Sequence, residues 1–163
     1  MKHIYLSILI ILSTFSVIAQ NDNVIYSFET TNNKVVQLIY NETDSIFIYR
    51  FLSRDKKIEL EVRDDLKDDN IVFTVHGYHR GGGVQNAAMD YNDIRFNKNG
   101  YDYDIYYVWV ANEENSDADN DPIFGIKVFK DGEEIADIKG SKVIKGEVYG
   151  WSFYDILPES KDI

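Results

Sequence analysis

Apolar and polar residues alternate most clearly between residues 71 and 111. In residues 101–109 every second side chain is aromatic or aliphatic, and the residues between them begin with Asp102 and Asp104. A two-residue period with aromatic and β-branched side chains is typical of a strand with one buried face. Glycine- and asparagine-rich segments separate three such runs. The pattern predicts a three-stranded antiparallel meander around which the rest of the chain closes.

The rest of the chain carries shorter apolar runs between turn residues. We expect further strands at residues 24–28, 35–40, 45–52, 57–63, 123–130 and 133–138, and a last strand or short helix at 148–157. Asp131 and Gly132 between two apolar runs predict a tight hairpin, whereas residues 139–146 resemble a loop. A bulge is expected near Ala87 and Ala88. The prediction is an all-β fold, a single antiparallel barrel or sandwich of about 8–10 short strands.

The first 19 residues have the features of a secretory signal peptide. Lys2 precedes an apolar run from Ile4 to Ile18, and Ala19 then supplies the small residue before the cleavage site, in the order that such signals share. The run is shorter than the roughly 20 residues that a membrane-spanning helix needs. We therefore expect a mature chain that begins at Gln20 and forms a single β domain over residues 20–163. Its expected location is secreted or periplasmic, in a bacterial envelope, without stable membrane insertion.

The chain is strongly acidic. It has 28 Asp and Glu residues against 17 Lys and Arg residues, which gives a formal net charge of −11. Removing Lys2 with the signal takes away one positive charge and leaves −12. Such a charge repels nucleic acid and anionic lipid and attracts basic proteins. The absence of cysteine excludes disulfides, thiolate metal sites and thiol nucleophiles.

A glycine-rich turn after the first strand of the meander is a candidate site. Three consecutive glycines between strands predict a turn whose backbone needs positive φ. Alternatively, they allow a partner to approach a bare backbone edge that is flanked by a phenol ring, an imidazole and a guanidinium. Such a surface would suit a carboxylate or a sugar. Its residues are Tyr78, His79, Arg80, Gly81, Gly82, Gly83, Asn86 and Asp90.

Metal binding and catalysis have less support in the sequence. His76 and His79 lie three residues apart on one strand, so they should point to opposite faces and not share a metal. Asp117, Asp119 and Asp121 form an alternating acidic run that either binds calcium or is a solvated loop. A serine–histidine–acid triad depends on folded geometry and stays open. The sequence shows no nucleophile-elbow motif, so a binding role is favoured over an enzyme, with calcium as the one cofactor to consider.

The motifs YHRGGG, NAAMDYNDIRF and NGYDYDIY lie within residues 75–109. This stretch resembles small exported bacterial proteins of unknown function, and the resemblance implies no activity. The overall plan is similar to that of the periplasmic lysozyme inhibitors, small β-barrels that block the active site of a basic enzyme. Their Ser-Gly-x-x-Tyr loop is absent here, and their disulfide is impossible without cysteine. The resemblance is one of architecture, so no functional residue is carried over.

These observations favour an exported, non-catalytic binding protein of the cell envelope, such as an inhibitor or immunity protein for a basic cell-wall-active enzyme. The alternative is a carbohydrate- or calcium-binding β module. Tyr101, Tyr103, Tyr107 and Trp109 would then form a sugar-stacking platform, although a core-facing strand explains their spacing more simply. The expected partner is a basic protein or a cell-wall saccharide and not nucleic acid.

Overall fold

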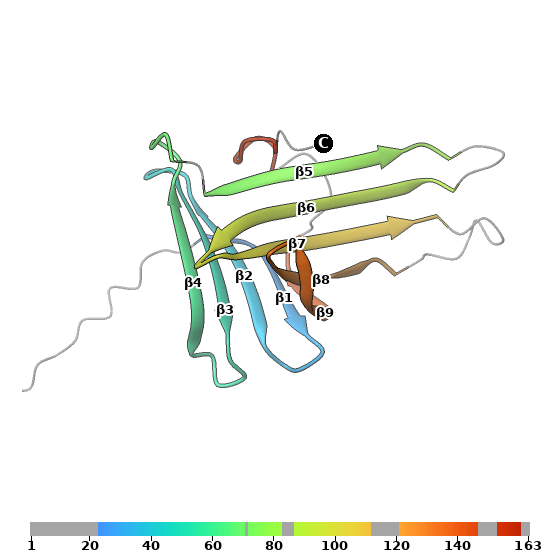
Figure 1. The fold of residues 1–163 in the computed structure, drawn as a ribbon, viewed down its shortest axis with the longest axis horizontal. Helices are drawn as coiled ribbons and strands as arrows, with labels where there is room; N and C mark the ends of the chain where they lie inside the picture. The colour runs from blue at the N-terminus through green and yellow to red at the C-terminus, as the bar shows by residue number, and fades with distance from the viewer. Residues whose placement is uncertain (1–22, 71, 83–86, 112–120, 147–152, 161–163) are drawn as a thin grey trace, which may run out of the picture.

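The computed structural model describes residues 23–70, 72–82, 87–111, 121–146 and 153–160. These residues form one antiparallel sheet of nine strands in the order β4-β3-β2-β1-β9-β8-β7-β6-β5. The strands are β1 (Val24–Thr30), β2 (Val35–Asn41), β3 (Ile46–Leu52), β4 (Ile58–Asp65), β5 (Phe73–Arg80), β6 (Met89–Lys98), β7 (Tyr101–Val110), β8 (Ile123–Lys130) and β9 (Glu133–Lys145). The sheet curls into a half-barrel in which β1–β4 run across the long strands β5–β7 (Figure 1). The predicted all-β fold is confirmed.

Two-residue turns connect β6 to β7 and β8 to β9. The first turn has Asn99 and Gly100 at φ values of 56° and 77°, and the second has Asp131 and Gly132 at 53° and 83°. Two successive residues at positive φ make a type I′ turn, whose twist matches that of the flanking strands. These turns set which side chains face one another across the hairpins.

The core fills the inside of the curl. Alternate residues of each strand point inward, and aromatic rings from the two halves of the sheet meet there. Phe47 of β3 packs against Phe73 of β5 with ring centroids 5.0 Å apart, and Tyr49 of β3 packs against Phe96 of β6 at 4.8 Å. Tilted and edge-on aromatic pairs stabilise a core beyond the area that they bury. These contacts hold β1–β4 against β5–β8.

A buried carboxylate links the edge strands β4 and β5. Asp64 in β4 accepts hydrogen bonds from the backbone N–H groups of Val72, at 2.9 Å, and Phe73, at 3.1 Å. The chain therefore enters β5 at a fixed place beside the end of β4. A carboxylate that is buried with such partners avoids the desolvation penalty of an unpaired one.

The C-terminal segment 153–160 covers part of the free edge of β5. The N–H of Val75 donates to the Pro158 carbonyl at 2.9 Å, and the Ser160 N–H donates to the Val75 carbonyl at 2.7 Å. Phe153 and Leu157 from the same segment are buried in the core. The segment thus caps the opening of the half-barrel on the β5 side.

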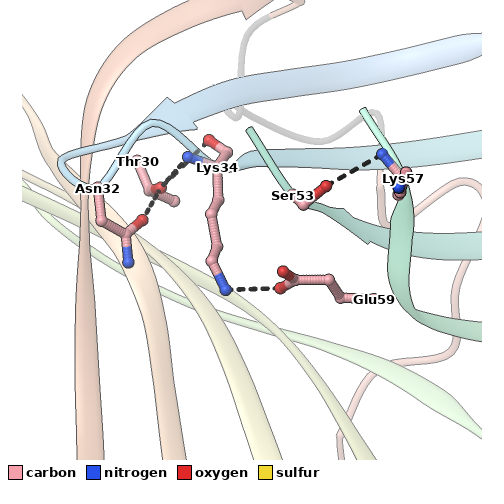
Figure 2. A network of polar contacts seen from close by, with 6 residues as sticks. All are labelled: Thr30, Asn32, Lys34, Ser53, Lys57 and Glu59. Atoms are coloured by element: carbon pink, nitrogen blue, oxygen red, sulfur yellow. Dashed lines mark hydrogen bonds and ion pairs between the residues drawn. The ribbon is translucent and has the colours of Figure 1, made fainter. Parts of the chain in front are cut away.

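Polar contacts fix the turns of the first four strands (Figure 2). The buried Thr30 hydroxyl oxygen accepts the backbone N–H of Lys34 at 3.0 Å, which closes the β1–β2 turn. The Lys34 ammonium reaches Glu59 of β4 at 2.6 Å. In the β3–β4 turn, the Ser53 hydroxyl oxygen accepts the backbone N–H of Lys57 at 3.1 Å.

Several expected boundaries were wrong. β9 continues to Lys145, so the loop expected at 139–146 is mostly strand. This part of β9 leaves β8 and pairs with β1, and its side chains are largely exposed, which removes the alternation that marks a strand. β6 begins at Met89, and its pairing with β5 is regular, without the bulge expected near Ala87 and Ala88. The described part of the closing segment begins with a turn, and residues 148–152 lie outside the described residues.

Within the residues that the structure describes, no helix has the length and apolar character needed to cross a membrane.

Candidate functional site

Polar side chains form two rows across the outer face of β5–β9. The alternation that points Phe73, Ile94 and Ile105 inward points their neighbours outward, and the regular register aligns these neighbours from strand to strand. The first row contains Thr74, Arg95, Asp104, Lys127 and Asp137, and the second contains His76, Asp93, Tyr106 and Lys139. Charges of both signs are thus concentrated on one part of the sheet.

Asp93 is the most deeply buried charge of these rows. Its side chain has 0% of its surface exposed. Its Oδ2 accepts hydrogen bonds from Nε and Nη2 of Arg95, at 3.0 and 2.6 Å. The imidazole Nδ1 of His76 lies 3.4 Å from the other oxygen. Asp93 and Arg95 therefore form a charge pair in which one end of the guanidinium is occupied.

Asp104 of β7 is almost as buried, with 8% of its surface exposed, but it has fewer partners. Its Oδ2 accepts a hydrogen bond from the Tyr91 hydroxyl at 3.3 Å, and its Oδ1 has no hydrogen-bond partner among the described residues. Burial, reinforced by the negative charge of Asp93, raises the pKa of Asp104 to about 7, against the opposing effects of Arg95, Tyr91 and Lys127. An incompletely satisfied buried carboxyl is costly to stability, and such groups often mark functional sites.

An open pocket of about 520 Å³ lies against this outer face. β5, β6, β7 and β8 all contribute to it. Asp102 and Asn97 are joined at its wall by a hydrogen bond from the Asn97 amide at 2.8 Å. Its lining includes Thr74, Arg95, Asn97, Asp102, Asp104 and Phe129. The pocket thus offers hydroxyl, amide, guanidinium and carboxylate groups next to an aromatic ring, and its volume falls within the roughly 300–1,000 Å³ of small-molecule sites.

Comparisons of the chain with models of protein families, with curated proteins and with solved structures find no match. The pocket is therefore interpreted from its own chemistry.

A second polar group stabilises the outer face beside the pocket. The Tyr106 hydroxyl donates to Asp137 at 2.9 Å, and the Lys139 ammonium contacts Asp137 at 2.5 Å and the Tyr106 oxygen at 3.1 Å. Burial works to raise the pKa of Asp137, but the hydrogen bonds from Lys139 and Tyr106 outweigh it and lower that pKa. Tyr106, Asp137 and Lys139 therefore satisfy one another's hydrogen-bonding groups, in contrast to Asp104.

The glycine-rich turn predicted as a site lies at the far end of β5, away from the pocket residues. His79 forms an ion pair with Asp90 of β6, and the Arg80 Nε donates to the Ala87 carbonyl at 3.1 Å. Tyr78 is 51% exposed. The structure therefore brings His79 and Asp90 together, while Gly83 and Asn86 lie outside the described residues.

The expectation of positive φ in this turn was wrong for the two glycines that are described. Gly81 and Gly82 both lack positive φ, and neither would suffer more than ordinary contact if it carried a Cβ. Tight two-residue turns need positive φ, whereas eight residues separate β5 from β6 here, and positive φ is not required of Gly81 and Gly82. The opposite orientations predicted for His76 and His79 are confirmed, because His76 lies beside the outer Asp93 and His79 pairs with Asp90 on the other face.

The predicted calcium loop is mostly outside the described residues. Asp117 and Asp119 lie there, and Asp121 is exposed. Among the described residues, no group of three or more His, Asp or Glu side chains is arranged to hold a metal ion. The calcium site therefore stays a prediction. The four aromatic residues of β7 considered as a sugar platform pack against or within the core, namely Tyr101, Tyr103, Tyr107 and Trp109.

Asp93, Arg95 and Asp104 were not predicted as site residues from the sequence. A signal was present, because Asp102 and Asp104 alternate with the tyrosines of β7 and must face away from the core. The Asn99–Gly100 turn fixes the register, so Arg95 stands opposite Asp104. What the pattern did not reveal is that Asp93 and Asp104, although they lie on this outward face, would themselves be buried.

Proposed function

We propose that the protein is a non-catalytic binding protein of the cell envelope and that it holds a carbohydrate in the outer-face pocket. The observation that carries this proposal is the mixture of planar polar groups and an aromatic ring around one cavity of about 520 Å³. Sugars present hydroxyl groups for hydrogen bonding and patches of C–H for packing on aromatic rings. Asn97, Arg95 and Phe129 supply both kinds of contact.

The placement of the carboxylates supports binding over hydrolysis. A glycosidase uses two carboxyl groups that flank the scissile bond from different sides. Asp102 and Asp104 follow one another on the same face of β7, so both approach a ligand from one side. We propose the cell envelope as the location because the sequence predicts a signal peptide. Cell-wall saccharides are the carbohydrates available there.

The experiment is a calorimetric or ligand-observed NMR titration of the mature chain with cell-wall mono- and disaccharides. Phe129→Ala should weaken binding by about tenfold or more, since it removes the ring. Tyr78→Ala is the matched control, because it removes an exposed aromatic ring at the other end of the sheet. Absence of binding by every saccharide would refute the proposal, and equal effects of the two substitutions would place the ligand elsewhere.

A second candidate function is binding of a basic protein, such as a cell-wall-active enzyme that the chain would inhibit. It is favoured by a concentration of exposed carboxylates at one end of β2–β4. The Leu66 N–H donates to the Ser45 carbonyl at 2.9 Å, which brings the β2–β3 turn beside the segment after β4. The exposed acids of these two segments and of the last position of β4 are Glu42, Asp44, Asp65, Asp68 and Asp69. Association steered by such charges is fast and falls with salt.

Surface plasmon resonance with a purified basic muramidase tests this second candidate. Neutralising Glu42, Asp68 and Asp69 together should reduce the association rate at low salt by about tenfold. The control neutralises three exposed acids at other turns, Asp55, Asp131 and Glu133. Equal loss in both variants would indicate a response to net charge alone and would reject this surface as a specific site.

A further inference from the structure

The pocket contains more unbalanced negative charge than positive charge. Asp102 and Asp104 both line it, and Arg95 is the cationic residue among its described lining residues. The Arg95 guanidinium already donates twice to Asp93 behind the pocket wall. Its charge is therefore largely compensated before any ligand arrives.

The lysine on the neighbouring strand β8 forms its ion pair with a residue other than Asp104. Lys127 stands directly opposite Asp104 in the pairing of β7 with β8. Its ammonium is directed to Glu134 of β9, at 3.0 Å. Two cations thus stand beside Asp104, one on each neighbouring strand, and each has a carboxylate partner other than Asp104.

Asp104 is the group in the pocket wall that requires a further partner. More than nine-tenths of its surface is buried, and its Oδ1, which has almost no accessible surface, accepts no hydrogen bond from any described residue, so the carboxyl is stabilised mainly by positive charge that comes close to it. A buried carboxylate oxygen gains most from a charged donor, and an ammonium group offers three donors with a full positive charge. A neutral hydroxyl would not compensate the charge that the carboxyl carries when it is ionised.

We infer that the ligand of this pocket is an amino sugar with a free amine. Its primary ammonium group, which lies next to its hydroxyl groups, pairs with Asp104 and Asp102. This inference rests on the proposed carbohydrate-binding function and names the class of sugar. Asn97 and Thr74 would bind the hydroxyl groups, and Phe129 would pack against the ring. An anionic sugar is disfavoured, because it would face the two carboxylates while Arg95 is engaged.

The test compares four small molecules on the mature chain at neutral pH by calorimetric titration. Glucosamine carries the free amine, glucose lacks it, N-acetylglucosamine has it blocked, and methylammonium has the charge without the sugar. Glucosamine should bind at least about tenfold more tightly than each of the other three. The difference between glucosamine and glucose should shrink as salt is added, because it is electrostatic.

Substitutions of the two pocket carboxylates test whether they cause the preference for glucosamine. Asp104→Asn and Asp102→Asn should each remove most of the preference for glucosamine over glucose, while Asp131→Asn, in the exposed β8–β9 turn, should leave it unchanged. Circular dichroism of each variant establishes that it is folded before the titration. Retention of the preference in both pocket variants would overturn the inference.

The inference and the proposed function fail in different ways. If glucose and N-acetylglucosamine bind as well as glucosamine, the pocket binds sugars and the amine is irrelevant. If methylammonium binds as well as glucosamine, the site recognises a cation and not an amino sugar. If none of the three sugars binds, the proposed carbohydrate function itself is rejected.

Discussion

Replacement of Asp104 by Asn should increase the stability of the chain at neutral pH. The carboxyl of Asp104 is buried, and burial together with the charge of Asp93 raises its pKa from 3.8 to about 7. An Asn side chain has nearly the same shape and can still accept the hydrogen bond from Tyr91. The substitution therefore removes a buried charge with little change in packing.

The size of the effect follows from the pKa shift. The rise of the Asp104 pKa from 3.8 to about 7 corresponds to about 4 kcal/mol, since a tenfold change in the ionisation equilibrium is worth about 1.4 kcal/mol. Because the folded-state pKa lies above the unfolded value, the contribution of Asp104 to stability is fully present below about pH 4. It is lost as the pH rises towards 7, and it stays lost above pH 7. The pKa of about 7 already includes the lowering effects of Arg95 and Lys127, and relaxation of the protein around the ionised carboxylate makes 4 kcal/mol an upper value.

The assay is urea denaturation of both proteins at intervals from pH 4 to pH 8. The free energy of unfolding of Asp104→Asn minus that of the wild type should rise by about 2–4 kcal/mol over this range. Taking the difference cancels the titration of groups that lie far from Asp104 and that both proteins share. Asp102→Asn is the control, because it removes an exposed carboxylate from the same face of β7. A flat difference for Asp104→Asn would refute the assignment of Asp104 as a buried carboxyl that resists ionisation.

Three further predictions concern the turns and the acidic loop. Gly132→Ala should destabilise the chain by about 1–2 kcal/mol in urea denaturation, because Gly132 has φ of 83°, whereas Gly82→Ala should cost less than about 0.5 kcal/mol. His79→Ala and Arg80→Ala should each lower the free energy of unfolding by less than about 1 kcal/mol. If either variant loses more binding free energy for a pulled-down partner than folding free energy, the glycine-rich turn recognises that partner. Millimolar calcium should raise the melting temperature of the wild type but not of Asp119→Ala if the acidic loop binds it, and an unchanged wild-type curve would reject the site.

Most of the sheet could be predicted from the sequence because strand formation here depends on local features. The two-residue period of β7 and the two-residue turns at Gly100 and Gly132 are visible without knowledge of the fold. The end of β9 could not be predicted in this way. It becomes a strand through pairing with β1, more than 100 residues earlier in the chain, and its exposed side chains do not alternate. Its structure therefore depends on the partner strand and not on its own pattern.

The candidate site was harder to predict than the sheet, and the reason lies in burial. The period of β7 places Asp104 on the outward face, and an outward Asp on a half-buried strand is normally solvated. Here Tyr91 bonds to Asp104, while Arg95 and Lys127 stand opposite it on the neighbouring strands, so the carboxyl is nearly enclosed. None of these residues is near Asp104 in sequence, and each comes beside it only through the register of three strands. A polar residue on the outer face of a curled sheet becomes a candidate site residue when its cross-strand neighbours are large enough to bury it and are paired with other partners, and Asp104 meets both conditions.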